Sequence, residues 1–284
     1  VFLPVRQLGR LIRDKQVSPV ELAETFLDRL ETLGPEYNAV VTITRDRAMR
    51  QARNAEQEII AGQYRGPLHG IPFGAKDLLA TSEGIPTTWG AVPYRDQTFD
   101  HDATVLQKLE EVGAVLTAKL AMVELAGGMG YRQPNASLTG PGINPWNKDA
   151  WSGGSSSGSG SSVAAGLVPF AIGSETFGSI LSPAGNCGIA GLRPTYGRVS
   201  RYGAMALSWT LDKLGPLCLT ADDCGLVLDA IAGYDPNDPS TTEQPYTYDS
   251  SDLSGRRFRL AVITGVADGA EKEIQANFKD SLNV

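Results

Sequence analysis

Histidine and cysteine are scarce in this sequence, which has two histidines and three cysteines among 284 residues. The cysteines, Cys187, Cys218 and Cys224, form no Cys-x-x-Cys pair, so the spacing of a zinc site is absent. Their odd number and wide spacing indicate reduced, buried thiols, and we therefore expect a cytoplasmic protein. We also expect no metal and no cofactor. Chemistry that needs an imidazole has only His69 and His101 to use.

Long apolar runs and an excess of basic residues are absent too. No run of about 20 apolar residues could span a membrane, and no charged-then-apolar segment has the character of a signal peptide. Lys and Arg number 25 against 32 Asp and Glu, a net charge of −7, whereas nucleic-acid binding needs clustered basic residues. We expect a small-molecule substrate, no nucleic-acid or membrane partner, and a monomer or homodimer.

The segments that are present alternate between helical and strand-like patterns. Ser18 and Glu21 have the spacing of a capping box in front of an apolar helix face. Residues 39–43 form an apolar run typical of a buried strand, and Asp102 is placed to cap a helix that ends at Gly113. This alternation predicts an α/β fold with a mixed or parallel sheet.

The end of the chain carries one more strand-like segment. The run "FRLAVI" predicts a strand at 258–263, and a polar segment comes after it. A strand so late in an α/β chain usually continues the sheet. We therefore expect one domain over residues 1–284 that lacks the C-terminal part of its parent fold.

The stretch "WSGGSSSGSGSSVAAG", residues 151–166, allows three interpretations. Its composition is that of a flexible linker, but an apolar run comes directly after it, and linkers do not usually enter a core so abruptly. It also matches the G-x-S-x-G nucleophile elbow, centred on Ser156, but that elbow needs a histidine later in the chain and both histidines come earlier. The third interpretation joins the stretch to the residues after it, which predict a buried helix beginning at 163 and a strand near 168–172.

Read as far as residue 203, this region strongly resembles the amidase signature family. The resemblance rests on Gly-Gly-Ser-Ser, "VAAGLVP", "GSETFGSI" and "CGIAGLRPTYGRVSRYG". Upstream "GPLHGIPFGAKD" and "TGPGINPWN" also match, and so do "LDKLGPL" and "LDAIAGYDP" downstream, so the resemblance covers most of the chain. It implies the amidase-signature fold, in which a central mixed β-sheet is flanked by α-helices on both faces.

The resemblance also implies a Ser-Ser-Lys triad in place of Ser-His-Asp. The nucleophile is then Ser179, the bridging serine is Ser155, held by a cis peptide bond to Gly154, and the base is Lys76. The chemistry is consistent, because a serine hydroxyl needs an adjacent base and a lysine serves only when neutral. Its pKa must fall from about 10.4 to roughly 7–8, which burial can achieve. Lys119 is an alternative base, because it too lies in an apolar stretch of sequence, and the resemblance to the family selects Lys76.

Two further groups of site residues are implied by the same resemblance. The oxyanion donors would be backbone N–H groups of the turn Thr176, Phe177, Gly178 and Ser179. The acyl pocket would be lined in part by Gly127, Gly128 and Met129. Family members commonly carry Gly where Phe177 stands, Asp where Glu175 stands and Arg where Leu181 stands. These departures leave the triad intact and indicate a less polar surrounding.

The expected function is a hydrolase of carbonyl C–N bonds acting through an acyl-serine intermediate. Amide, aryl ester and carbamate (urethane) carbonyls share the tetrahedral geometry that such a site stabilises, so esterase and urethanase activity are included. The alternative is the A subunit of a glutamyl-tRNA amidotransferase, a glutaminase within a complex, because "PTYGRVSRYG" and "LDAIAGYDPND" resemble that branch closely. A relative without catalysis, kept for binding only, is the third possibility.

Overall fold

The computed structural model describes residues 1–127, 133–248 and 258–283, and it divides the chain into two compact units. The first unit is Val1–Tyr248 and the second is Asp249–Val284. The predicted α/β class is confirmed by the first unit, whereas the single domain over 1–284 stays a prediction. Among the described residues, no helix combines the length and apolar character needed to cross a membrane.

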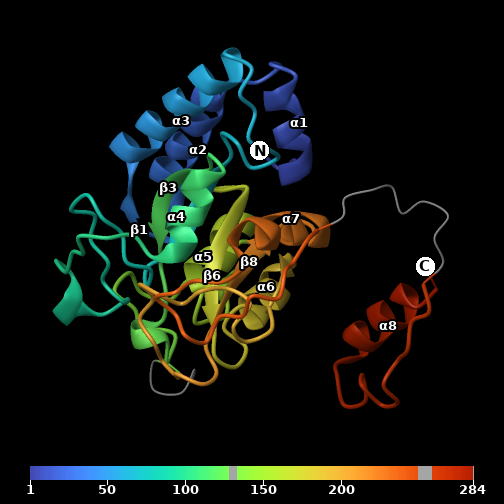
Figure 1. Cartoon of the computed structure of the whole chain (residues 1–284). Coiled ribbons are helices and arrows are strands. Elements are labelled where there is room, and N and C mark those ends of the chain that lie inside the picture. Colours follow the sequence, from blue (N-terminus) through green and yellow to red (C-terminus); the bar gives the residue numbers. More distant parts are fainter. Residues whose placement is uncertain (128–132, 249–257, 284) are drawn as a thin grey trace. The chain divides into compact units, whose positions relative to one another are not determined.

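A mixed sheet of six strands forms the centre of the first unit (Figure 1). Its strands, in their order across the sheet, are β1 (Val40–Ile43), β3 (Val115–Leu120), β2 (Pro72–Lys76), β6 (Phe170–Glu175), β8 (Lys213–Cys218) and β7 (Ala190–Gly191). Strand β2 is parallel to both β3 and β6, and the other pairs are antiparallel. A separate hairpin joins β4 (Ile143–Asn144) to β5 (Asn147–Trp151).

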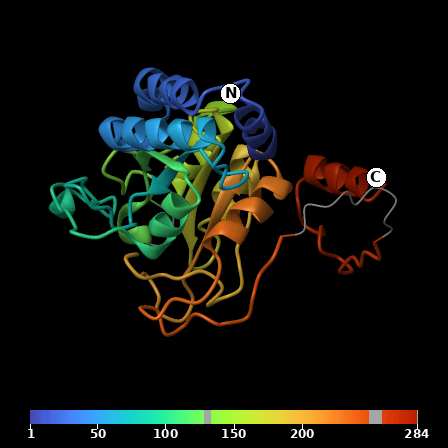
Figure 2. The same cartoon turned by 45° about the horizontal axis from the view of Figure 1, so that its top comes forward.

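Helices cover both faces of this sheet, as predicted. They are α1 (Val5–Arg13), α2 (Pro19–Leu33), α3 (Arg45–Ile60), α4 (Thr104–Glu111), α5 (Ser157–Ala164), α6 (Leu181–Cys187) and α7 (Ala221–Ile231). Side chains alternate along β6: Phe170 and Ile172 join the core formed with α1, α4 and α7, while Ala171 joins the core formed with α5 and α6. Figure 2 shows α2 and α3 side by side, where they pack against each other and against β3.

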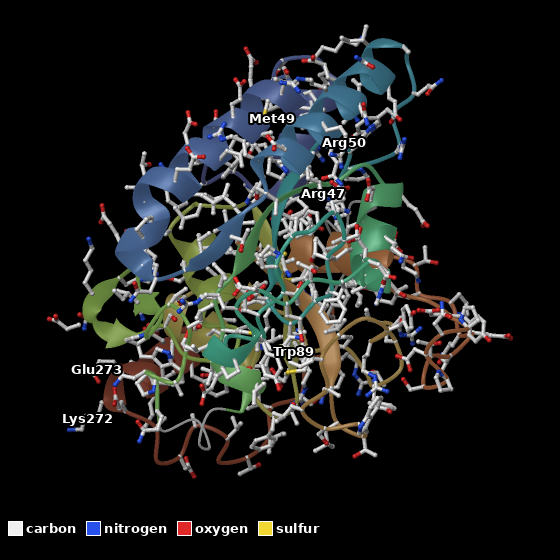
Figure 3. The ribbon with its side chains drawn as sticks, turned by 90° about the vertical axis from the view of Figure 1, so that its left-hand side faces the viewer. Arg47, Met49, Arg50, Trp89, Lys272 and Glu273 are labelled. Carbon is white, nitrogen blue, oxygen red and sulfur yellow. The ribbon has the colours of Figure 1, made fainter. Side chains whose placement is uncertain are left out.

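The predicted cap of α2 is confirmed and that of α4 is wrong. The Ser18 hydroxyl accepts hydrogen bonds from the amides of Val20 and Glu21, and the Glu21 carboxylate accepts one from the Ser18 amide. Asp102 does not cap α4, since its carboxylate accepts two hydrogen bonds from Arg47 instead. Arg47 belongs to α3 (Figure 3) and also pairs with Glu110 of α4. The ion pair with the buried Arg47 guanidinium therefore orients the Asp102 carboxylate away from the start of the helix.

The Gly/Ser stretch is not a flexible linker: it is a short buried loop followed by a helix. Its second half is helix α5, and every residue from Ser152 to Val163 is buried. The prediction that a helix begins at 163 is wrong, because α5 begins at Ser157 and ends at Ala164. Small residues permit this burial: a Cβ on Gly158 would lie 2.3 Å from the carbonyl oxygen of Ala39. Close approach of backbones outweighs the poor helix propensity of Gly and Ser here.

The predicted strand at 258–263 is wrong. These residues form no strand, and Phe258, Leu260, Val262 and Ile263 are all exposed. With these side chains in solvent, the apolar run buries no face against a core, which a strand of the sheet would do. The second unit contains one helix, α8 (Lys272–Ser281), among its described residues.

Candidate active site

Lys76 is the last residue of β2, at the carboxyl edge that the parallel strands β2, β3 and β6 share. Open α/β sheets place their ligands at this edge. Strand alternation sets Phe73 and Ala75 in the core beneath α1, α4 and α7, so Lys76 extends toward the opposite face, which α5 covers. The long side chain is completely buried.

Two serines surround the Lys76 amine. Its Nζ lies 2.7 Å from the Oγ of Ser155 and 2.9 Å from the Oγ of Ser174, with the Ser174 carbonyl oxygen at 3.5 Å. Burial lowers the pKa of Lys76 to about 7, against the opposing effect of the carboxylates of Asp212 and Glu175. This value lies within the range that a lysine base requires near neutral pH.

The three contacts of Lys76 match the bonding capacity of a neutral amine. A neutral amine has one lone pair and two N–H groups. The two oxygens of Ser174 can take the N–H groups, which leaves the lone pair for the hydroxyl proton of Ser155. An ammonium would donate to all three oxygens equally well, so it is the lowered pKa of Lys76 that provides a neutral amine able to receive a proton from Ser155. Sequence reasoning missed Ser174, because its place beside Lys76 depends on the pairing of β2 with β6.

Ser179 lies in the turn between β6 and α6 and is buried. Its carbonyl oxygen accepts a hydrogen bond from the amide of Ser156 at 3.2 Å, so the turn is tied to the residue next to Ser155. The Gly154–Ser155 peptide bond is cis, as the resemblance implies. Ser156 is no nucleophile elbow, because its hydroxyl is held between the carbonyl and the amide of Ser174. The structure thus gathers Lys76, Ser155 and the Ser179 turn at one place.

Glu175 binds the residues that follow Ser179 in this turn. Its buried carboxylate accepts hydrogen bonds from the amides of Ile180 at 2.8 Å and Leu181 at 2.9 Å, and from Arg193 at 3.1 Å. Burial alone would raise the pKa of Glu175, but hydrogen bonds from Leu181, Ile180, Gly178 and Arg193 lower it below its ordinary value. The Gly178 amide therefore lies near the Glu175 carboxylate, and its oxyanion role stays a prediction.

Asp212 binds the first residue of the turn, Thr176. Sequence reasoning also missed Asp212. Its carboxylate accepts a hydrogen bond from the hydroxyl of Thr176 and two from the amides of Leu207 and Ser208, at 2.7 and 2.9 Å. The neighbouring Lys213 donates to the Thr176 carbonyl at 3.0 Å. The motif "LDKLGPL" marked this region, but only the antiparallel pairing of β6 with β8 reveals the contact.

The second lysine and the two histidines fall outside this arrangement. Lys119 is fully buried, but it pairs with Asp77 at 3.1 Å and donates to the Thr87 hydroxyl, so it is occupied elsewhere. His69 is buried beside Glu58, and His101 lies beside Asp100. Gly127 packs near Leu207. Gly128 and Met129 lie outside the described residues.

The cysteines and acidic residues do not assemble a metal centre in the part of the chain that the structure describes. Cys187, Cys218 and Cys224 are free and buried, which confirms the predicted buried thiols. Burial raises the pKa of the Cys187 thiol to about 12, so this thiol stays protonated at neutral pH.

The fold and the site together define an α/β protein in which a buried lysine meets a serine beside a tight serine turn. Comparison with known proteins agrees with this class. The model of the Amidase family matches residues 21–284, and the chain therefore belongs to that family. The A subunit of glutamyl-tRNA(Gln) amidotransferase from Carboxydothermus hydrogenoformans is 39% identical over an alignment of 285 residues, covering 98% of this chain and 58% of that protein.

Solved structures give the same result. The native peptide amidase of Stenotrophomonas maltophilia superposes with a TM-score of 0.80 at 34% identity, covering 85% of this chain and 50% of that one. A bacterial aryl acylamidase of the amidase signature family superposes with a TM-score of 0.77 at 29% identity, covering 86% of this chain and 50% of that one. The chain thus spans about half the length of the relatives it matches.

Proposed function

We propose that this protein hydrolyses carbonyl C–N bonds through an acyl intermediate on Ser179. The observation that carries the proposal is the 2.7 Å contact between the Nζ of Lys76 and the Oγ of Ser155, made by a lysine whose pKa burial lowers to about 7. A neutral amine in contact with a serine relay is what a Ser-Ser-Lys hydrolase needs and what an ordinary surface lysine lacks.

The reaction is built from these positions. The Ser179 Oγ attacks the carbonyl carbon while its proton passes to Ser155, and Ser155 gives its own proton to the Lys76 amine. Backbone amides of residues 176–179 stabilise the oxyanion. The tetrahedral intermediate then expels the amine, which takes the proton back from Lys76 through Ser155. Water hydrolyses the acyl-Ser179 ester by the same proton route and restores the hydroxyl.

The rim of the site favours uncharged substrates. Phe177 is 84% exposed beside the oxyanion turn, and Leu181 is 43% exposed just after the nucleophile. Two apolar side chains at these positions attract apolar acyl or leaving groups and offer nothing to a charged one. Aryl or alkyl amides, aryl esters and carbamates are therefore the proposed substrates.

A serine-directed sulfonyl fluoride tests the proposal. With phenylmethylsulfonyl fluoride, the Ser179 oxygen forms a bond to sulfur, fluoride leaves, and the proton passes through Ser155 to Lys76. Mass spectrometry should place one sulfonyl group on Ser179 and none on the Ser179→Ala variant. Ser156→Ala is the matched control and should still be labelled. A panel of anilide, p-nitrophenyl ester and carbamate substrates should be turned over with the same dependence on Ser179. Absence of both labelling and turnover would refute the proposal.

A second candidate function is that of the A subunit of an amidotransferase, and the 39% identity to such a protein favours it. In that role Ser179 would attack the side-chain amide of glutamine and release ammonia. Turnover of glutamine without turnover of anilides or esters, and co-purification with partner subunits, would support this function over the first.

A further inference from the structure

A pocket of about 590 Å³ lies beside the candidate active site, outside all the residues assigned so far to substrate binding. Two of its lining residues contact the reaction centre directly. Ser174 holds the Lys76 amine, and Asp212 holds the hydroxyl of Thr176 in the oxyanion turn. A substrate whose carbonyl lies at the Ser179 turn can therefore extend past Asp212 into this pocket.

The lining of the pocket is mainly apolar and aromatic. Tyr196, Tyr202 and Trp209 contribute rings, and Met205 and Leu214 contribute aliphatic surface. Trp209 is 77% exposed, so most of its ring is available for contact. Pockets of roughly 300–1,000 Å³ with this lining are typical of small-molecule sites, and aromatic side chains bind flat rings by offset or edge-to-face contact.

The charged groups of the lining are already bound to the protein. Arg201 lies 3.5 Å from the carboxylate of Asp238 and donates to the Trp209 carbonyl and to the hydroxyls of Tyr196 and Ser240. The carboxylate of Asp212 is taken up by its hydrogen bonds to the 176 and 207–208 segments. A charged ligand would have to displace these partners, whereas an uncharged ring would displace only water.

We propose that this pocket binds an uncharged aromatic group of the substrate, carried by the amide nitrogen next to the carbonyl that Ser179 attacks. The inference rests on the proposed hydrolase function and adds the class of substrate. It also favours a hydrolase over a glutaminase, because an uncharged ring makes no demand on the charged groups of the lining, most of whose donors and acceptors are bound to neighbouring residues.

Binding measured without turnover tests the pocket. In the Ser179→Ala background, isothermal titration should show that acetanilide binds about tenfold more tightly than N-methylacetamide, which has no ring. Adding Trp209→Ala should weaken acetanilide binding about tenfold and leave N-methylacetamide unchanged. Trp146→Ala is the matched control, since Trp146 is 76% exposed on the β4–β5 hairpin, and it should change neither value.

A second variant keeps the test decisive if Trp209→Ala fails to fold, which thermal melting will show. Ala206 is exposed at the pocket wall, so Ala206→Trp should fill the pocket and abolish the preference for acetanilide. The inference is overturned if acetanilide shows no preference, or if Trp209→Ala and Ala206→Trp leave its binding unchanged. If Ser179 neither reacts with phenylmethylsulfonyl fluoride nor supports turnover of the substrate panel while the binding preference is intact, the hydrolase function is refuted and the pocket assignment stands.

Discussion

The amine of Lys76 lies 2.7 Å from the hydroxyl oxygen of Ser155, a residue 79 positions later in the chain. The contact is made inside the core, where the β2 strand end meets the segment before α5. Water does not reach the lysine, which is completely buried. The Ser155 hydroxyl therefore faces an amine that is neutral for half of the molecules near pH 7.

The first prediction concerns the pH dependence of activity. Because Lys76 acts only when neutral and burial lowers its pKa to about 7, kcat/KM should rise with pH through about pH 7 and level off above it. The profile should be recorded with an uncharged anilide, so that the substrate does not titrate. An acid limb near pH 9 or above would show that Lys76 keeps an ordinary pKa.

The pH dependence of the free energy of unfolding reports on the pKa of Lys76 without any need for turnover. The pKa of Lys76 is about 7 in the folded chain and about 10.4 when unfolded, so the unfolded state binds more protons between these values. The contribution of Lys76 to the free energy of unfolding should therefore increase as pH rises from 7 to 10. Lys76→Met should lack this increase, as denaturant unfolding at several pH values will show. Equal slopes in both proteins would contradict the assignment.

Asp212→Asn is the second prediction. The Asp212 carboxylate raises the pKa of Lys76, so its neutralisation should move the acid limb of kcat/KM to lower pH. The variant also replaces one carboxylate oxygen by an NH2 group, so the hydrogen bonds to Thr176 or to the amides of Leu207 and Ser208 are disturbed and the plateau of kcat/KM should fall. A role in folding alone would lower activity without moving the limb.

Asp238→Asn is the control for that experiment. Asp238 lines the same pocket and binds Arg201, but it does not contribute to the pKa of Lys76. Its variant should leave the acid limb in place even if the protein becomes less stable. A limb that moves equally in both variants would show that the shift comes from a general disturbance of the loops.

Short residue spacings and the family motifs predicted part of the fold and of the site. The remaining contacts depend on how strands far apart in the sequence pair with each other. The capping box of α2 and the Lys76–Ser155 contact were predictable, because a short spacing or an extended motif carries each. Ser174 and Asp212 were not, since their contacts arise from the register of β6 with β2 and β8. The helix inside the Gly/Ser stretch was missed because propensity disfavours it, whereas close packing against β3 requires small residues.

The third prediction tests this packing at Gly158. A Cβ at this position would lie 2.3 Å from the Ala39 carbonyl oxygen and 2.5 Å from the Ala121 nitrogen, both backbone atoms that cannot move aside cheaply. Gly158→Ala should therefore lower the free energy of unfolding by about 1–3 kcal/mol, even though alanine favours a helix. Gly185→Ala, in α6, is the matched control: its added Cβ meets no atom within 4 Å, and helix propensity should stabilise it by up to about 1 kcal/mol. Urea unfolding of both variants decides the question. If Gly158→Ala were as stable as Gly185→Ala, α5 would not be seated against β3 as described, and the position of Ser155 beside Lys76 would lose its support.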